Sequence, residues 1–266
     1  MEWPYARLTM YVDLERQVMA SHGKPVPKKL KNDAIVEAIF EMRFDTSIIP
    51  EILFGRLADY GPWKNLRQGR LPSYEIPLPI RQADPNLRFQ PVFELTGDHR
   101  TIRVGPQVIS YHRVAPYIGW QRFLQELIET ITGVFEKANG LIVRRLGLRY
   151  LNALRPDLHG IRSVSDLDLK IEVASRPVVG NVNINFTVDP GAATGCTVRI
   201  ATREFVYGAL PPNTSVYVDV DVFTPEGFEA DERNAVVAWV TEAHSKEKEQ
   251  FFRLLTDESI DKLEER

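Results

Sequence analysis

The sequence predicts an α+β protein with a mostly antiparallel, strongly curved sheet and long helices packed on one of its faces. Many segments alternate apolar and polar side chains at every second position, as half-buried strands do. These segments follow one another through short turns, which is typical of antiparallel pairing. Two long segments instead repeat apolar residues at three- and four-residue spacing, which predicts two amphipathic helices.

Length and composition fit one well-formed domain behind a short arm. The chain has 266 residues, of which 44% are hydrophobic and 26% charged, and its net charge is -3. Residues 1–30 are predicted to be an N-terminal arm and linker, because a weak helical pattern is followed by a polar, basic, proline-containing stretch. Residues 31–266 are predicted to form a single α+β domain. Since both parts of it are rich in strands, a division into two similar halves, 31–155 and 156–266, is a further expectation.

The first part of the domain opens on a clear strand, because apolar and polar residues alternate from Ala34 to Phe44. Asp45-Thr46-Ser47 supplies capping side chains for a helix near Ile49 to Tyr60. Residues 61–88 are rich in proline, which removes amide donors, so we expect only short edge pieces there. The elements predicted next are strands over Arg88–Leu95, Thr101–Val104 and Gln107–Val114, then a helix over Trp120–Ala138.

The second part begins with the strand that we expect at the centre of the sheet, Arg144 to Leu154. Leu146, Leu148 and Tyr150 share one of its faces and the arginines the other. Further strands are predicted over Leu167–Ala174, Val182–Val188, Thr197–Phe205 and Ser215–Phe223. A long helix over Asp231–Leu255 follows, with Lys246-Glu247-Lys248-Glu249 interpreted as its solvated face, and a short helix ends near Leu263.

The candidate binding residues are charged or polar side chains on these strands. Such alternation usually marks the solvent face of an antiparallel sheet. The alternative is that the faces converge inside a curved sheet, where opposite charges pair and the set binds an anion or a divalent cation. The candidates are Glu37, Glu41, Arg43, Arg145, Arg149, Asn152, Asp219 and Asp221.

Several classes of protein lack support in the sequence. It has no glycine-rich phosphate loop, no Gly-x-Ser-x-Gly elbow, no His-Glu-x-x-His motif and only one cysteine, Cys196. We therefore expect no metal site and no cofactor, and no catalytic residue is assigned. No apolar run is long enough to span a membrane, and no signal peptide is evident. We expect a cytoplasmic protein without a membrane partner.

One motif carries a family resemblance. Gly147-Leu148-Arg149-Tyr150-Leu151-Asn152, with the strand around Val36–Phe44 and the stretch Tyr117-Ile118-Gly119-Trp120, resembles a sporadically distributed prokaryotic family. Its members are proteins of roughly 250 residues without an established activity, and the resemblance covers about residues 30 to 262. It implies no catalytic residues. The patchy distribution implies accessory genes, such as phage-defence or toxin–antitoxin neighbourhoods.

Three functions follow as hypotheses. The leading one is a non-enzymatic binding protein that acts through another protein or through self-association. The alternative is a metal-dependent phosphohydrolase or nucleotide-binding protein with Glu37, Glu41 and Arg43 in its site. Nucleic-acid binding through Arg144, Arg145, Arg149 and Arg155 is disfavoured, because Arg144 and Arg145 face opposite ways on a strand and the chain is acidic overall.

Overall fold

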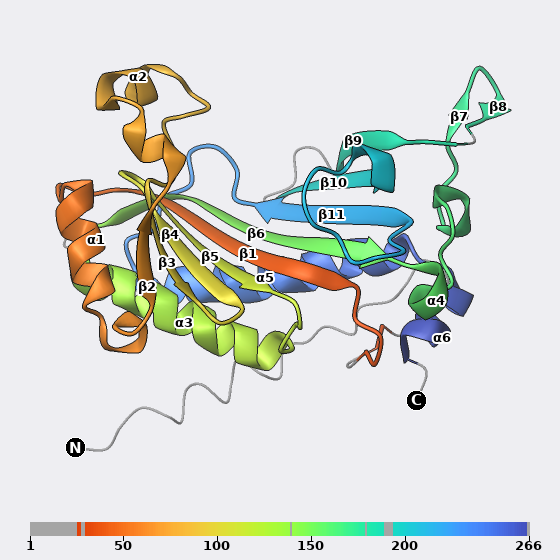
Figure 1. Cartoon of the computed structure of the whole chain (residues 1–266), viewed down its shortest axis with the longest axis horizontal. Helices are drawn as coiled ribbons and strands as arrows, with labels where there is room; N and C mark the ends of the chain where they lie inside the picture. Colours follow the sequence, from red (N-terminus) through yellow and green to blue (C-terminus); the bar gives the residue numbers. More distant parts are fainter. Residues whose placement is uncertain (1–25, 28–29, 139, 179, 189–193, 265–266) are drawn as a thin grey trace.

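The computed structural model describes residues 26–27, 30–138, 140–178, 180–188 and 194–264. The arm predicted from the helical pattern of residues 1–20 lies outside these residues. The described chain forms one large sheet with long helices behind it (Figure 1). The expected α+β class with a large antiparallel sheet is confirmed.

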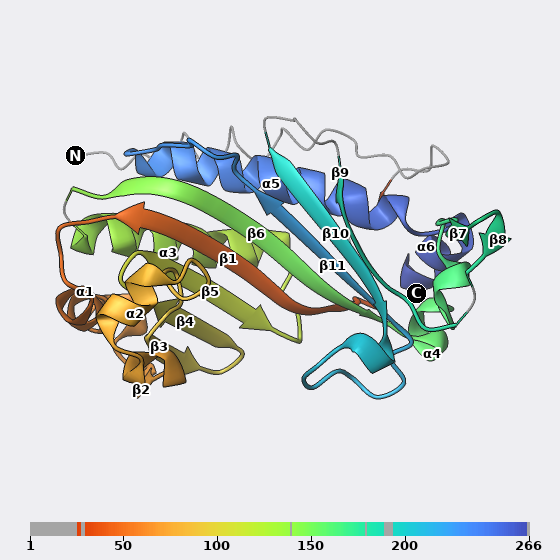
Figure 2. The same ribbon diagram turned by 90° about the horizontal axis from the view of Figure 1, so that it is seen from above.

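The nine strands of the sheet follow the order β2-β3-β4-β5-β1-β6-β11-β10-β9, and every neighbouring pair is antiparallel. β1 (Ile35–Asp45) and β6 (Ile142–Leu154) pair at its middle. β2 and β9 form its two edges, so the sheet is open, and Figure 2 shows it as a twisted layer. The strong curvature predicted from the sequence is not confirmed. The remaining strands are β2 (Arg67–Arg70), β3 (Phe93–Gly97), β4 (Arg100–Val104), β5 (Val108–Val114), β9 (Asn183–Val188), β10 (Gly195–Thr202) and β11 (Val216–Phe223).

The connections run in the same sense on both sides of the central pair. On one side β5, β4, β3 and β2 lie outward of β1. The chain runs through them from β2 inward to β5 and then enters helix α3 (Trp120–Lys137). On the other side β11, β10 and β9 lie outward of β6. The chain runs through them from β9 inward to β11 and then enters helix α5 (Arg233–Arg253). Both helices lie behind the same face of the sheet (Figures 1 and 2).

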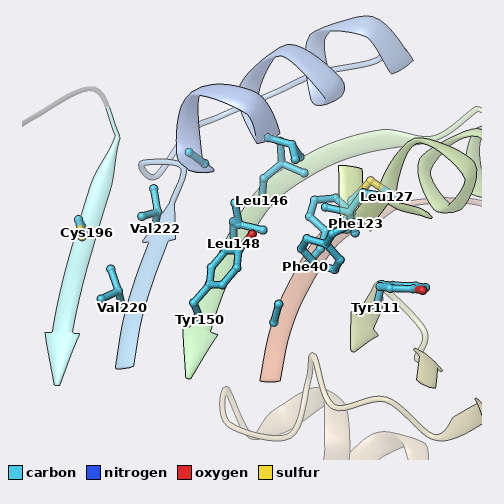
Figure 3. Close-up of a cluster of buried hydrophobic side chains, with 14 of the residues drawn as sticks. Phe40, Tyr111, Phe123, Leu127, Leu146, Leu148, Tyr150, Cys196, Val220 and Val222 are labelled. Atoms are coloured by element: carbon cyan, nitrogen blue, oxygen red, sulfur yellow. The ribbon is translucent and has the colours of Figure 1, made fainter. Parts of the chain in front are cut away.

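The core fills the layer between the sheet and these two helices. Because side chains alternate along a strand, Phe40 on β1, Leu148 on β6 and Val220 on β11 all point toward the helices (Figure 3). Phe123 and Leu127 of α3 meet them from the other side, and all five side chains are fully buried. The opposite face of the sheet carries the charged residues.

Smaller helices close the ends of the layer. α1 (Pro50–Ala58) follows β1, and α6 (Asp257–Glu264) packs on α4 (Pro156–His159) near the end of the described chain. α2 (Leu78–Ala83) lies within the proline-rich segment and projects from the sheet in Figure 1. No helix among the described residues is both long enough and apolar enough to cross a membrane.

Three strand predictions need correction. The strand expected over Arg88–Leu95 begins only at Phe93, because the chain turns through residues 84–90 and Pro91 has no amide to donate. The strand expected over Thr197–Phe205 ends at Thr202 and turns into a short 3-10 helix. The strand expected over Leu167–Ala174 is wrong: only β7 (Glu172–Val173) forms there, paired with β8 (Arg176–Pro177) in a separate hairpin.

Candidate functional site

The sequence-predicted charged residues meet on the sheet face that points away from α3 and α5. They come from the central strands β1, β6 and β11, where the side chains of these odd-numbered residues point away from the helices. Over these strands the described chain places no helix on this side (Figures 1 and 2). We call this surface the charged face and define it by Glu37, Glu41, Arg43, Arg145, Arg149, Asp219 and Asp221.

Glu41 is the acceptor of two arginines. Arg43 Nε donates to Glu41 Oε1 at 2.8 Å, and Arg145 Nη1 donates to the same oxygen at 2.9 Å. The backbone register explains the pairing, because Arg43 lies opposite Arg145 and Glu41 lies opposite Gly147. A Cβ atom on Gly147 would lie 3.2 Å from Arg145 Nη1, so the glycine leaves room for the guanidinium group.

The second ion pair joins β6 to β11. Arg149 donates through Nε to Asp219 Oδ1 at 2.7 Å and through Nη2 to Asp219 Oδ2 at 2.5 Å, a bidentate arrangement. These hydrogen bonds raise the pKa of Arg149 above its ordinary value. Burial raises the pKa of Asp221, and the charges of Arg145 and Arg149 oppose that shift. The charged face is therefore a coupled set of acids and arginines across three strands.

Glu37 lies at the edge of this set and has a different partner. His112 Nδ1 lies 2.7 Å from Glu37 Oε1, and Ser110 Oγ lies 2.9 Å from His112 Nε2. With Nδ1–H donating to the carboxylate, Nε2 of a neutral imidazole accepts the hydroxyl proton of Ser110. Burial alone would raise the pKa of Glu37, but the hydrogen bond from His112 and nearby positive charges outweigh it and lower the pKa.

The arginines of the nucleic-acid hypothesis do not gather into one patch. The expected alternation does not hold at Arg144, because the pairing of β1 with β6 shifts register between Arg43 and Phe44. Arg144 pairs with Asp45 and Glu229. Arg155 pairs with Asp157 at 3.7 Å beyond the end of β6. Because each of these arginines has its own acidic neighbour, the geometry offers no continuous positive track to a phosphate backbone.

Asn152 is the candidate that the structure separates from the rest. Its even number places it on the helix side of β6, where it is 1% exposed and donates to the carbonyl oxygen of Val218 at 3.3 Å. There it lines a pocket of about 260 Å³. The charged face and this pocket therefore lie on opposite sides of the sheet.

The pocket is built from five parts of the chain. β6 contributes Tyr150 and Asn152, and α5 contributes His244 and Glu247. Tyr117 comes from the turn before α3, and Trp120 is the first residue of α3. Residues 30–35 close the rim. The Tyr117 hydroxyl lies 3.2 Å from that of Tyr150, which lies 3.4 Å from His244 Nδ1. The His244 ring stacks on Trp120 with ring centroids 3.8 Å apart. Burial, with a contribution from Lys248, lowers the pKa of His244 to about 3, so its ring is neutral.

Glu247 is the functional candidate that the sequence reasoning missed. The interpretation of Lys246–Glu249 as a solvated face is wrong at Glu247, which is only 5% exposed. A signal was present: Val240, Ala243, Glu247 and Phe251 follow the three- and four-residue spacing of the buried stripe of α5. Charge composition outweighed this periodicity in the prediction. Burial, together with the charge of Asp33, raises the pKa of Glu247 to about 8.

The fold and these contacts define a class of protein, an open antiparallel α+β scaffold with an ion-paired face on one side and a polar pocket on the other. A scan against protein-family models matches none of them, and a search of curated proteins finds no match. The resemblance to the sporadically distributed prokaryotic family stays a prediction.

Proposed function

We propose that this protein is a non-enzymatic binding protein that acts through a protein partner docked on the charged face. The observation that carries the proposal is the set of mutual ion pairs across β1, β6 and β11. These pairs hold the charges in place while leaving them accessible: the side chain of Arg149 is 42% exposed and that of Glu41 is 29% exposed. Side chains that are already ordered lose less entropy on binding, and a defined charge pattern selects a complementary surface.

The proposed partner is another protein or a second copy of this chain. The phage-defence or toxin–antitoxin setting, which only the family resemblance implies, stays a prediction. The strand order supports one finer proposal, that residues 31–155 and 156–266 are two similar halves. In each, a long first strand lies beside an antiparallel meander, of four strands in the first half and three in the second, and a long helix follows.

An exchange of charges tests the docking surface without removing its ion pair. The variant Glu41→Arg/Arg145→Glu places an acid between two arginines again but inverts the pattern. The matched control is Glu258→Lys/Lys262→Glu, which exchanges an exposed pair on α6 whose charged atoms are 2.9 Å apart. Partners are captured from host lysate and identified by mass spectrometry, and self-association is measured by analytical ultracentrifugation.

We expect the wild type and the α6 exchange to retain the same partner, or the same self-association. The exchange on the charged face loses it while its thermal unfolding midpoint stays close to that of the wild type. If all three proteins captured the same partner equally, the docking surface would lie elsewhere. If the purified protein turned over nucleotides or nucleic acid at ordinary enzyme rates, of about 1–1,000 per second, the non-enzymatic proposal would fail.

The metal-dependent alternative has weaker support from the geometry. The Glu41 carboxylate already accepts from Arg43 and Arg145, and Glu37 is paired with His112. A divalent cation would have to displace these partners from the carboxylates. Calorimetric titration with Mg²⁺ and Mn²⁺ tests this alternative, and Glu41→Ala is the control. If the titration of the wild type gives no heat of binding, the metal-dependent alternative is eliminated.

One observation favours a second candidate function, hydrolysis through Ser110. The chain of hydrogen bonds from Ser110 through His112 to Glu37 has the order nucleophile, base and orienting carboxylate that activates a serine hydroxyl. Arg103 lies directly across from Ser110 on β4 and would supply the positive charge for a developing oxyanion. A fluorophosphonate probe should then label Ser110 in the wild type but not in His112→Gln. Absence of labelling in the wild type eliminates this candidate.

A further inference from the structure

The pocket between α5 and β6 contains a carboxyl group whose position needs an explanation. Glu247 is 5% exposed and lines the pocket. Burial, the charge of Asp33 and the charge of Lys248 shift the pKa of its carboxyl group, and among the described residues no hydrogen bond to it contributes. Burying a carboxyl group without a partner costs free energy, so a side chain of this kind inside a pocket points to a ligand that supplies the missing interaction.

Titratable and charged side chains from several elements of the pocket wall surround Glu247. Asp33 stands at the rim before β1, where its Oδ1 accepts from the amide of Ile35 at 2.9 Å. Tyr117 and Tyr150 present neutral hydroxyl groups, and His244 is neutral because burial lowers its pKa. Lys248 is the one cationic side chain among the described lining residues. With both carboxyl groups ionised, the described wall therefore carries net charge -1.

The other walls are aromatic and apolar. Trp120, Tyr117 and Phe251 line the pocket together with Ile35 and Phe252. Aromatic faces stabilise an organic cation through their quadrupoles, and they offer nothing to a metal ion, which needs several oxygen or nitrogen ligands. Among the described residues no group of three or more His, Cys, Asp or Glu side chains forms a potential metal site.

The size of the pocket limits the ligand. Its volume of about 260 Å³ lies just below the roughly 300–1,000 Å³ of pockets that hold drug-sized molecules. An ammonium group with a short apolar or aromatic body fits both the volume and the chemistry of the walls.

We propose that this pocket binds a small protonated amine, whose ammonium group donates to Glu247 and whose apolar body lies against Trp120 and Phe251. Asp33 adds a second negative charge at the rim. The Tyr117 and Tyr150 hydroxyl groups and the Asn152 amide provide hydrogen-bonding partners for a polar substituent. This site is independent of the charged face, since the two lie on opposite sides of the sheet.

The proposal predicts a coupled proton release. In the free protein Glu247 is protonated at neutral pH, because burial and the charge of Asp33 raise its pKa to about 8. A bound ammonium group favours the carboxylate, so binding at pH 7 should release about one proton for each amine. Affinity should therefore rise between pH 6 and pH 8.

The probe is 2-phenylethylamine, with the neutral analogue 2-phenylethanol as its match in shape. Both are titrated into the full chain by isothermal calorimetry at pH 7 in two buffers of different ionisation enthalpy, which measures the proton release. Glu247→Gln removes the charge while keeping the shape of the side chain. Glu242→Gln removes the same charge from the exposed side of α5 and is the matched control.

We expect the amine to bind at least tenfold more tightly than the alcohol, with proton release. Glu247→Gln should lose at least tenfold in affinity for the amine and lose the proton release, while Glu242→Gln behaves as the wild type. Equal binding of amine and alcohol, binding that Glu247→Gln leaves unchanged, or no binding of the amine at millimolar concentration would each overturn the proposal.

One more variant addresses a lysine of the chain itself. Lys28 and Lys29 follow Pro27, a pocket residue, in the sequence and lie outside the described residues. Lys28→Ala/Lys29→Ala should leave the affinity for the amine within about twofold of the wild type. A gain of tenfold or more would mean that an internal lysine competes for Glu247, and the small-amine proposal would then give way to internal pairing.

Discussion

Single residues account for the order of the charged face, and Gly147 is the clearest example. Its missing side chain lets the Arg145 guanidinium group reach Glu41 across the pair of central strands. Arg145 also lies over the ring of Phe223, 5.2 Å from the centroid, which limits its freedom to move away. The glycine of the central motif is therefore explained by packing next to an ion pair.

Gly147→Ala should destabilise the protein slightly, by about 0.5–1 kcal/mol, because the new Cβ displaces Arg145 from Glu41. The matched control is Gly55→Ala in α1, where a new Cβ has no atom within 4 Å. That variant should gain about 0.5–1 kcal/mol from helix propensity. Urea denaturation of both variants checks the two signs, and a Gly147→Ala protein more stable than the wild type would contradict this account.

Glu247 should make the stability fall as the pH rises. Its pKa is about 8 in the folded protein against 4.5 ordinarily, so between these values the folded state holds a proton that the unfolded state has released. The unfolding free energy therefore decreases with rising pH in this window. Relative to Glu247→Gln, the wild type should lose roughly 3–5 kcal/mol between pH 4.5 and pH 9. Urea denaturation of both proteins across this range is the measurement, and parallel profiles would refute the shift.

At the scale of elements, register decides which charges can meet. β6 pairs with β1 on one side and β11 on the other, so its two odd-numbered arginines face acids on different neighbours. Arg145 takes its acid from β1 and Arg149 takes its acid from β11. The ion pairs therefore also report the strand order at the centre of the sheet.

The Arg149–Asp219 pair should couple β6 to β11 by about 1–3 kcal/mol in a double-mutant cycle. Removing either partner alone is not equivalent, because the Asp219 side chain is 5% exposed and that of Arg149 is 42% exposed. Arg149→Ala leaves a buried carboxylate without its main partner and should cost more than Asp219→Ala. Equal costs for the two single variants, with no coupling, would show that water screens this pair completely.

At the scale of the whole molecule, one core spans the sheet from side to side. Buried residues of β1, β6 and β11 contact the same layer beneath α3 and α5, and β1 pairs with β6 along most of its length. A division at residue 155 would separate these central strands and expose their apolar face. The two halves, although similar in topology, are therefore not expected to fold independently of each other.

The full chain should unfold in a single transition. Circular dichroism reports the sheet and helices. Tryptophan fluorescence reports Trp63 and Trp120, which precede residue 155, and Trp239, which follows it. Coincident urea curves from both signals are expected of one cooperative unit. Two separated transitions, or a stable folded fragment of residues 31–155, would contradict this prediction.

The sequence by itself determined the fold class, most strands, both long helices and the side of each strand that carries charge. These are local properties, because alternation and helical periodicity follow from backbone geometry over a few residues. Tertiary structure decided which charges pair, that Asn152 belongs to a pocket, and that Glu247 is buried. Register, strand order and the packing of α5 on β6 bring together residues that are far apart in the sequence, such as Glu41 and Arg145, which are 104 positions apart. No local pattern in the sequence predicts such a contact.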